Sequence, residues 1–190
     1  MATKNNRRVL VTKKILKESL LTLMKEKPIS KISIKEICDL AEMSRSTFYL
    51  HYQDQYELLA DIENTVLENT YEALDDLKDD LNTIDSIEKF LNYVKSNKET
   101  FGVLLCQQNT EDFQNAIVNK IGQLVQESID DFPDTLENNY LIVFIMQGCL
   151  QVIRTWIQKD FDLSVPEFSR LIFKMCSYRI AFPIQPRQQY

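Results

Sequence analysis

The sequence predicts an all-α protein, in which a three-helix, homeodomain-like helix-turn-helix head is joined by a long helix to an α-helical body. Three observations lead to this prediction. The 190 residues include only three glycines and five prolines, too few for the many turns of a β-rich fold. Apolar residues recur at steps of three and four through most of the chain. Two such segments near the N-terminus are separated by a turn of two residues, Glu42 and Met43.

The first helix is predicted over residues 9–25, where Leu16, Leu20, Leu23 and Met24 form an apolar stripe. A proline and a short polar passage then separate it from the helix-turn-helix. Three helices within the first 52 residues are typical of a compact, homeodomain-like bundle.

Capping residues mark both helices of the helix-turn-helix. Ser33 and Glu36 have the spacing of a capping box at the start of the first of these helices. Ser44 can cap the second, whose inward face carries Phe48 and Tyr52. The side chains of residues 45–47 and 49 are then left on the outward, N-terminal part of the second helix, where a recognition helix reaches base edges in the major groove. This arrangement predicts DNA binding.

Beyond the head, Asp54 is expected to cap a long lever helix from Gln55 to Leu81. Further helices are predicted over residues 85–95, 101–106, 111–132, 140–158 and 164–176. The helix at 140–158 is apolar nearly all round, so we expect part of its surface to be covered by a second subunit. The predicted divisions are a DNA-binding domain at 1–53, an effector-binding and dimerisation domain at 54–180, and a loose tail at 181–190.

Charge is distributed unevenly along the chain. The net charge is −6, but residues 1–52 carry 11 Lys and Arg against 5 Asp and Glu, a balance of +6. The remaining residues carry 11 basic against 23 acidic groups, a balance of −12. A basic first quarter on an acidic body indicates that one end of the molecule meets a polyanion.

Other classes of function find little support. The four cysteines are widely spaced without a CxxC pair, and the chain has a single histidine, so no metal site is predicted. We favour buried, reduced thiols over redox sensors. No glycine-rich phosphate loop or Ser/His/Asp set is present, so we expect no cofactor and no enzyme activity. The N-terminus is polar and basic, and the longest unbroken apolar run, residues 140–146, has seven residues; both predict a cytoplasmic protein without a membrane span.

The segment Ser-Thr-Phe-Tyr-Leu-His-Tyr-Gln-Asp-Gln-Tyr-Glu-Leu-Leu at 46–59 resembles the TetR/AcrR family of bacterial transcriptional regulators, over about residues 10–60. Gln147 to Leu150, Trp156-Ile157 and the helix that begins at Ser164 are similar to a C-terminal domain of Gram-positive members, including regulators related to those of dihydroxyacetone kinase operons. The resemblance implies a homodimer on a near-palindromic operator of double-stranded DNA. It also implies a repressor that a small-molecule effector releases by changing the spacing of the two heads.

Three positions depart from the family pattern. Glu42 stands where the turn usually has glycine, so we expect a strained or altered turn. Gln55 replaces a lysine that meets a phosphate, and Leu50 replaces a frequent basic residue. Because two phosphate contacts would be missing, an alternative remains open: a TetR-like co-regulator that works mainly through a partner protein and binds DNA weakly.

The candidate DNA-binding residues are Ser33, Ser44, Arg45, Ser46, Thr47, Tyr49, His51 and Gln55. By resemblance, Thr47, Tyr49 and His51 contact the DNA backbone or base edges, and Arg45 and Ser46 read bases. For Tyr49 we favour contact over packing, and for His51 a phosphate hydrogen bond over a switch or ligand role. For Arg45, a guanine contact and an ordinary surface position stay equally open.

In the body, the candidate effector-binding residues are mainly aromatic and apolar: Phe101, Leu104, Phe113, Ile117, Tyr140, Phe144 and Gln147. Such walls suit an apolar or aromatic small molecule, although core packing is the favoured role for each residue taken singly. The candidate dimer-interface residues are Cys149, Ile153, Trp156, Phe168, Leu171 and Met175.

Overall fold

A computed structural model describes residues 4–75, 84–106, 110–128 and 135–177, and all regular secondary structure in these ranges is helical. The all-α prediction is confirmed. The elements in chain order are α1 (Lys4–Met24), the 3-10 turn η1 (Ile29–Lys31), α2 (Ile34–Leu40), α3 (Arg45–Tyr49), α4 (Gln55–Asp75), α5 (Ile84–Ser96), α6 (Lys98–Cys106), α7 (Glu111–Ser128), α8 (Leu136–Gln158) and α9 (Val165–Ser177).

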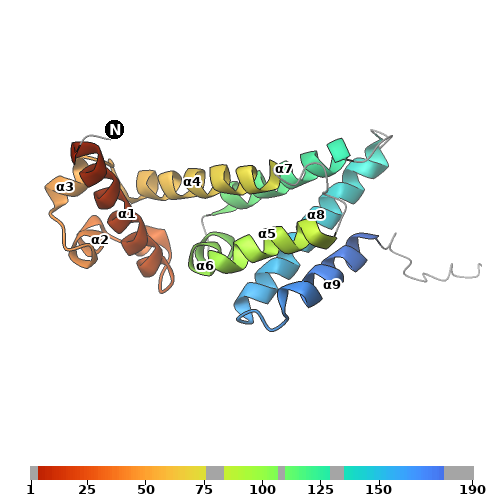
Figure 1. Ribbon diagram of the computed structural model, residues 1–190. Helices are drawn as coiled ribbons and strands as arrows, with labels where there is room; N and C mark the ends of the chain where they lie inside the picture. The colour runs from red at the N-terminus through yellow and green to blue at the C-terminus, as the bar shows by residue number, and fades with distance from the viewer. Residues whose placement is uncertain (1–3, 76–83, 107–109, 129–134, 178–190) are drawn as a thin grey trace, which may run out of the picture.

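The molecule is elongated, with the head at one end and the body at the other (Figure 1). Helices α1, α2 and α3 form the head, and α4 leaves it to run beside α7. Helix α5 packs along α9, while α6 and α7 both pack on α8. The recognition helix α3 therefore lies far from α8 and α9, and α4 spans the distance between head and body.

Local capping signals located several helix starts correctly. Ser33 and Ser164 both form the predicted capping boxes, and the side chain of Asp54 accepts backbone N–H groups from the first turn of α4. Three starts differ from prediction by several residues: α1 begins at Lys4 instead of residue 9, α6 begins at Lys98 instead of residue 101, and α8 begins at Leu136 instead of residue 140, capped by the preceding Thr135. The predicted end of the lever helix near Leu81, the last residues of the 111–132 helix and the tail at 181–190 lie outside the described residues.

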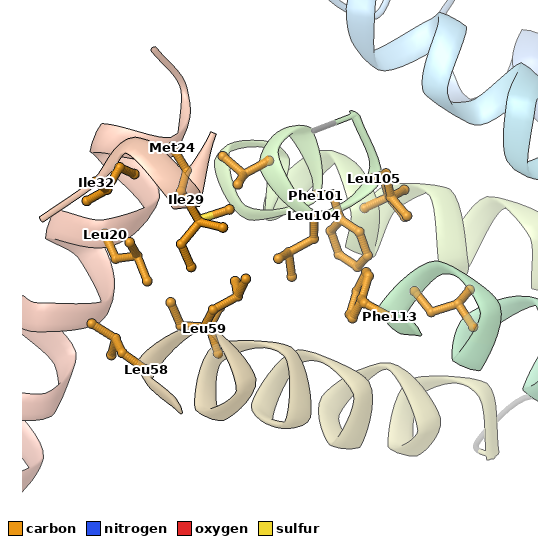
Figure 2. Packing of buried hydrophobic residues seen from close by; sticks show 14 of the residues in the cluster. Leu20, Met24, Ile29, Ile32, Leu58, Leu59, Phe101, Leu104, Leu105 and Phe113 are labelled. Atoms are coloured by element: carbon orange, nitrogen blue, oxygen red, sulfur yellow. The ribbon is translucent and has the colours of Figure 1, made fainter. Parts of the chain in front are cut away.

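One hydrophobic core runs from the head into the body (Figure 2). Leu20 and Met24 of α1 face Leu58 and Leu59 of α4, and the cluster continues to Leu104 of α6. All five side chains are buried. The core thus crosses the boundary predicted between residues 53 and 54, and the head and the body are packed against each other without a gap in the core.

Helix α8 has one buried and one exposed apolar face. Met146, Leu150, Ile153 and Trp156 point into the core, whereas a set of large apolar side chains on its N-terminal half is exposed: Leu136, Tyr140, Leu141, Val143 and Phe144. By length and composition alone, α8 is long and apolar enough to cross a membrane. Core helices of soluble proteins pass the same test. The exposed face requires a covering surface of some kind.

Candidate nucleic-acid interface

The recognition helix α3 begins at a well-formed cap. Ser44 Oγ accepts a hydrogen bond from the Thr47 backbone N–H at 3.1 Å, as predicted. The same hydroxyl lies 2.7 Å from Ser46 Oγ and 2.8 Å from Thr47 Oγ1. Three hydroxyl groups are therefore gathered at the N-terminus of α3, the end from which a recognition helix meets bases and phosphates.

The inward face of α3 is fixed by aromatic packing. Phe48 is fully buried and Tyr52 is nearly so, with their ring centroids 5.9 Å apart. Tyr49 meets Phe48 edge to face at 5.8 Å, yet 57% of its surface remains exposed. Phe48 thus orients the short helix, and Tyr49 projects from its outer side.

The eight candidate DNA-binding residues all lie in the head or at the first residue of α4, and all are accessible to some degree. The exposed ones are Ser33, Ser44, Arg45, Ser46 and Tyr49, and the half-buried ones are Thr47, His51 and Gln55. Hydrogen bonds join three of them, Ser44, Ser46 and Thr47, into one hydroxyl cluster. Leu50, the apolar substitute for a basic residue, directly follows α3 and is 79% exposed.

The turn before α3 has the conformation that favours glycine. Glu42 has a φ of 51°, in the left-handed region, and the next residue, Met43, donates its N–H to the Cys38 carbonyl at 2.9 Å. A β-carbon in this region meets the backbone unfavourably. The turn therefore keeps the left-handed conformation that glycine normally adopts, and Glu42 adopts it at a steric cost.

The carboxylate of Glu36 stabilises the start of α2, the first helix of the helix-turn-helix. Glu36 accepts hydrogen bonds from the N–H and hydroxyl of Ser33 and pairs with Lys27. The hydrogen bond from Lys27, followed by those from Ser33, lowers the pKa of Glu36 to about 2. Glu36 is therefore charged at neutral pH and holds the start of α2 against the α1–α2 connection.

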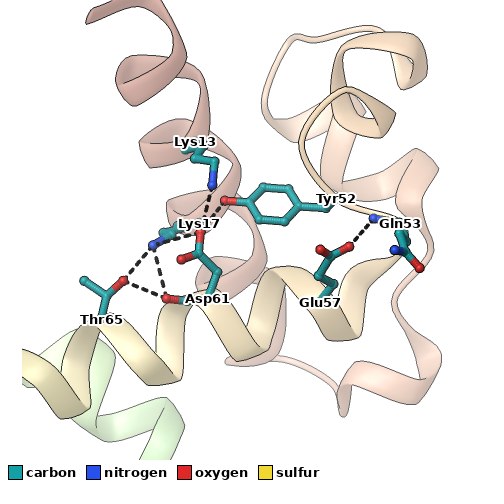
Figure 3. Close-up of polar contacts among 7 residues, drawn as sticks. All are labelled: Lys13, Lys17, Tyr52, Gln53, Glu57, Asp61 and Thr65. Atoms are coloured by element: carbon teal, nitrogen blue, oxygen red, sulfur yellow. Dashed lines mark hydrogen bonds and ion pairs between the residues drawn. The ribbon is translucent and has the colours of Figure 1, made fainter. Parts of the chain in front are cut away.

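A polar cluster around Asp61 joins the head to α4 (Figure 3). The Tyr52 hydroxyl donates to Asp61 Oδ2 at 2.7 Å, and Lys13 and Lys17 of α1 approach the same oxygen at 3.5 and 3.2 Å. Lys17 also donates to the Asp61 carbonyl and to Thr65 Oγ1. Burial raises the pKa of Asp61, but the hydrogen bonds from Tyr52 and Lys17 outweigh it and the net shift is downward.

The Asp61 cluster was not predicted from the sequence. Lys13 and Lys17 lie outside the apolar stripe of α1, and both form ion pairs with Asp61 of α4. An apolar stripe shows which face is buried, but it does not show which carboxylate a flanking lysine reaches. The i, i+4 spacing of Lys13 and Lys17 was the one available signal.

The predicted effector-binding residues fall into two separate groups. Phe101, Leu104, Phe113 and Ile117 are buried in the core. Tyr140 and Phe144 are 70% and 61% exposed, and Gln147 is also exposed. Four of the seven therefore lie in the core, and three lie on the outer face of α8.

The predicted dimer-interface residues are divided in the same way. Ile153, Trp156 and Phe168 are buried within the protomer, where Trp156 and Phe168 stack with ring centroids 4.4 Å apart. They are enclosed by their own chain and are not displayed to a partner. Cys149 and Leu171 are half-buried, and Met175 is 46% exposed.

A buried polar network that the sequence did not reveal ties α6, α7 and α8 together. Arg154 donates to the Leu105 carbonyl at 2.5 Å and to Gln114 Oε1. The Gln114 amide in turn donates to the Leu104 and Leu105 carbonyls at 3.3 Å. The network satisfies carbonyls at the C-terminal end of α6 that have no partner within the helix. Among the described residues, no group of three or more His, Cys, Asp or Glu side chains could hold a metal ion.

A capped, exposed recognition helix on a helical body defines a helix-turn-helix transcriptional regulator. Comparison with protein families agrees: residues 81–178, just over half of the chain, match the TetR-type family described as "Transcriptional regulator C-terminal region". The chain belongs to the TetR family of transcriptional regulators.

Individual relatives are distant. An uncharacterized HTH-type transcriptional regulator from Bacillus subtilis (strain 168), YxbF, is 22% identical over 170 residues, which cover 86% of this chain and 44% of that protein. The chain thus spans less than half the length of this relative. Among solved structures, a TetR transcriptional regulator from Streptococcus agalactiae 2603V has a TM-score of 0.68 at 19% identity, covering 93% of this chain and 99% of that one.

The resemblance to dihydroxyacetone kinase operon regulators also has a structural counterpart. The dihydroxyacetone kinase operon activator DhaS matches with a TM-score of 0.53 at 19% identity, over 88% of this chain and 94% of its own. At this identity the similarity shows a common fold. The family prediction made from the helix-turn-helix segment is confirmed.

Proposed function

We propose that this regulator binds operator DNA in a sequence-specific manner as a homodimer, and that residues 1–53 form its DNA-binding domain. The observation that carries the proposal is the exposed N-terminal end of α3. There, Arg45 and Ser46 are exposed beside the Ser44 cap, and Phe48 anchors the helix from below. Because the proposed target is operator DNA, we expect the protein to be located in the cytoplasm.

The contacts are expected to divide between positioning and reading. Arg45 is the candidate for base reading, because its guanidinium can form two hydrogen bonds to guanine. Tyr49 and His51 are candidates for phosphate contact, and the hydroxyls of Ser33, Ser44 and Thr47 stand where phosphates approach helix starts. Phosphate contacts hold the head in register, so their loss affects all DNA sequences similarly.

Dimerisation is proposed through the exposed face of α8, with Met175 of α9. Tyr140, Val143 and Phe144 lie on one side of α8, because residues three and four apart share a helix face. More than half of each of their surfaces is exposed. A twofold-related copy would cover them isologously and place two heads on a near-palindromic operator. The proposed interface therefore lies on the outer face of α8 and does not include the buried Trp156 and Phe168.

We further propose that the protein is a repressor and that a small-molecule effector releases it from DNA. The proposed effector site contains fewer residues than the sequence suggested. Tyr140, Phe144 and Gln147 are accessible, whereas the four other candidate residues are reached only if α6, α7 and α8 move apart. Helix α4 shares the core with α6 and carries Asp61, so such a movement would be transmitted to the head. An effector shifts the equilibrium only if it prefers the non-binding arrangement.

One observation favours a second candidate function. Leu50 is exposed beside α3 where a basic side chain would assist DNA binding, and Leu40 of α2 is 48% exposed. These apolar side chains suit a partner protein, and the regulator would then bind DNA weakly. A gel-shift titration on the DNA upstream of its own gene distinguishes the two: steeply salt-dependent, competitor-resistant binding supports the operator-binding dimer, and weak, non-selective binding supports the co-regulator.

A further inference from the structure

Two cysteines from different helices face each other in the body. Sγ of Cys149 in α8 lies 3.5 Å from Sγ of Cys176 in α9, and the two residues are 27 positions apart. The sulfur atoms are in contact, with one thiol donating to the other. Cys38 and Cys106, the two other cysteines, are respectively buried in the head and placed on α6.

The helix pair holds the two thiols in this arrangement. Seven residues beyond Cys149, Trp156 of α8 stacks on Phe168 of α9, and the indole N–H donates to the Leu163 carbonyl at 2.9 Å. These contacts hold the end of α8 against the start of α9. A disulfide has an S–S length of about 2.05 Å, so the sulfur atoms must approach by roughly 1.5 Å, a distance within the reach of side-chain rotation.

The thiol pair is partly accessible in the protomer. Cys149 and Cys176 are both half-buried. Cys149 follows Tyr140 by nine positions, and at about 100° per residue the two side chains point to opposite sides of α8. A partner subunit on the Tyr140 face of α8 would therefore leave Cys149 uncovered.

We propose that Cys149 and Cys176 are a modification site, at which a hydroperoxide converts the two thiols into a reversible disulfide between α8 and α9. In the first step the thiolate of one cysteine attacks a peroxide oxygen; an S–O bond forms, the O–O bond breaks, and the departing oxygen takes up a proton and leaves as water or an alcohol. The second cysteine then attacks the sulfenic sulfur; the S–S bond forms, the S–O bond breaks, and the hydroxyl leaves with the proton of the second thiol as water. Two thiols are oxidised and one peroxide is reduced.

The contact between the thiols allows either sulfur to react first. Each thiol can donate to the other, and burial opposes thiolate formation at both. Whichever cysteine is oxidised first has its resolving thiol already in contact, at 3.5 Å.

The test is peptide mapping of the full chain after treatment with hydrogen peroxide and alkylation without reduction. The expected result is one cross-linked species, in which the peptide with Cys149 is joined to the peptide with Cys176. Both cysteines then lose alkylation, and dithiothreitol restores it. Separate alkylation of the two cysteines after oxidation, or disulfides only between different protein molecules, would overturn the proposal.

Three variants sharpen the result. Cys106→Ser is the matched control and should keep the cross-link in full. In Cys149→Ser and in Cys176→Ser, the remaining cysteine of the pair has no resolving thiol, so the sulfenic acid formed on it should be trapped by dimedone. The absence of dimedone label from both variants would contradict the proposal. These readouts do not depend on DNA binding, so they can succeed or fail independently of the proposed function.

Discussion

The hydroxyl of Tyr52 donates to the carboxylate of Asp61 at 2.7 Å, and this bond links the end of the recognition motif to the lever helix α4. Tyr52 is nearly buried, and Lys13 packs over its ring with its ammonium 5.1 Å from the ring centroid. The direction of α3 and the direction of α4 are therefore set by one shared group of side chains. A tilt of α4 must either carry the head with it or break these bonds.

Replacing Tyr52 by Phe should destabilise the protein by about 1–2 kcal/mol, because a hydrogen bond to a charged group is lost while the ring remains. Urea denaturation measures the effect. Tyr49→Phe is the matched control: its ring lies on the outer side of α3, and the free energy of unfolding should hardly change. Equal effects of the two substitutions would show that the Asp61 cluster contributes little.

Glu63 of α4 gives a pH-dependent prediction. Burial, and then the negative charge of Asp112 on α7, raises the pKa of Glu63 from 4.5 to about 7. A raised folded-state pKa gives stability that is fully present below the unfolded pKa and is lost as the pH rises through the folded one. Wild-type stability should therefore fall between about pH 4.5 and 7 through this group, and Glu63→Gln should remove that contribution.

The measurement is the urea midpoint of wild type and Glu63→Gln at pH 5 and at pH 8. The advantage of the variant should be larger at pH 8. Glu68→Gln, which alters an exposed carboxylate on the same helix, serves as the control. A difference that is independent of pH would mean that Glu63 titrates as an ordinary exposed group.

Glu42→Gly should stabilise the head by up to about 1 kcal/mol, because glycine adopts the left-handed conformation without the steric cost of a β-carbon. Glu42→Ala separates this effect from the loss of a negative charge, since alanine keeps the β-carbon. Thermal unfolding should show the gain for glycine alone. The conformational explanation fails if alanine stabilises equally.

Phe144→Glu tests the α8 interface. The side chain is 61% exposed, so the protomer should fold, but a charge in the covered patch should give monomers in light scattering and weaken operator binding at the same time. Asn115→Glu, on the exposed surface of α7, should leave the dimer intact. A Phe144→Glu variant that stays dimeric would place the interface elsewhere.

The elements set by neighbouring residues could be predicted from the sequence. Ser33, Ser44 and Asp54 each mark a helix start, because a cap depends on residues only two or three positions away. The inward position of Phe48 followed from the same short-range argument. These signals were enough to identify the helix-turn-helix, and the family was indicated by the resemblance of the segment at 46–59.

Features that depend on distant segments could not be predicted. Helix α8 is apolar on several faces, so its sequence does not show that Trp156 turns toward Phe168 while Phe144 remains outside. The Asp61 cluster and the Arg154–Gln114 network join helices that are far apart in sequence. The packing of the helices determines which side chains meet in these networks. The apolar periodicity of a single helix does not indicate which other helix it packs against.

The most direct test of DNA recognition by α3 is binding-site selection from random duplex DNA, followed by affinity measurements at several salt concentrations. The wild-type protein should enrich a near-palindromic site and lose affinity steeply with salt, with a slope of about −0.9 per neutralised phosphate. Arg45→Ala should lose about 1–3 kcal/mol on that site and relax its preference at one base pair in each half. Lys35→Ala, on the exposed surface of α2, is the basic control and should keep the preference. Failure to enrich any sequence, or an unchanged ranking of sites by Arg45→Ala, would contradict the role assigned to the recognition helix.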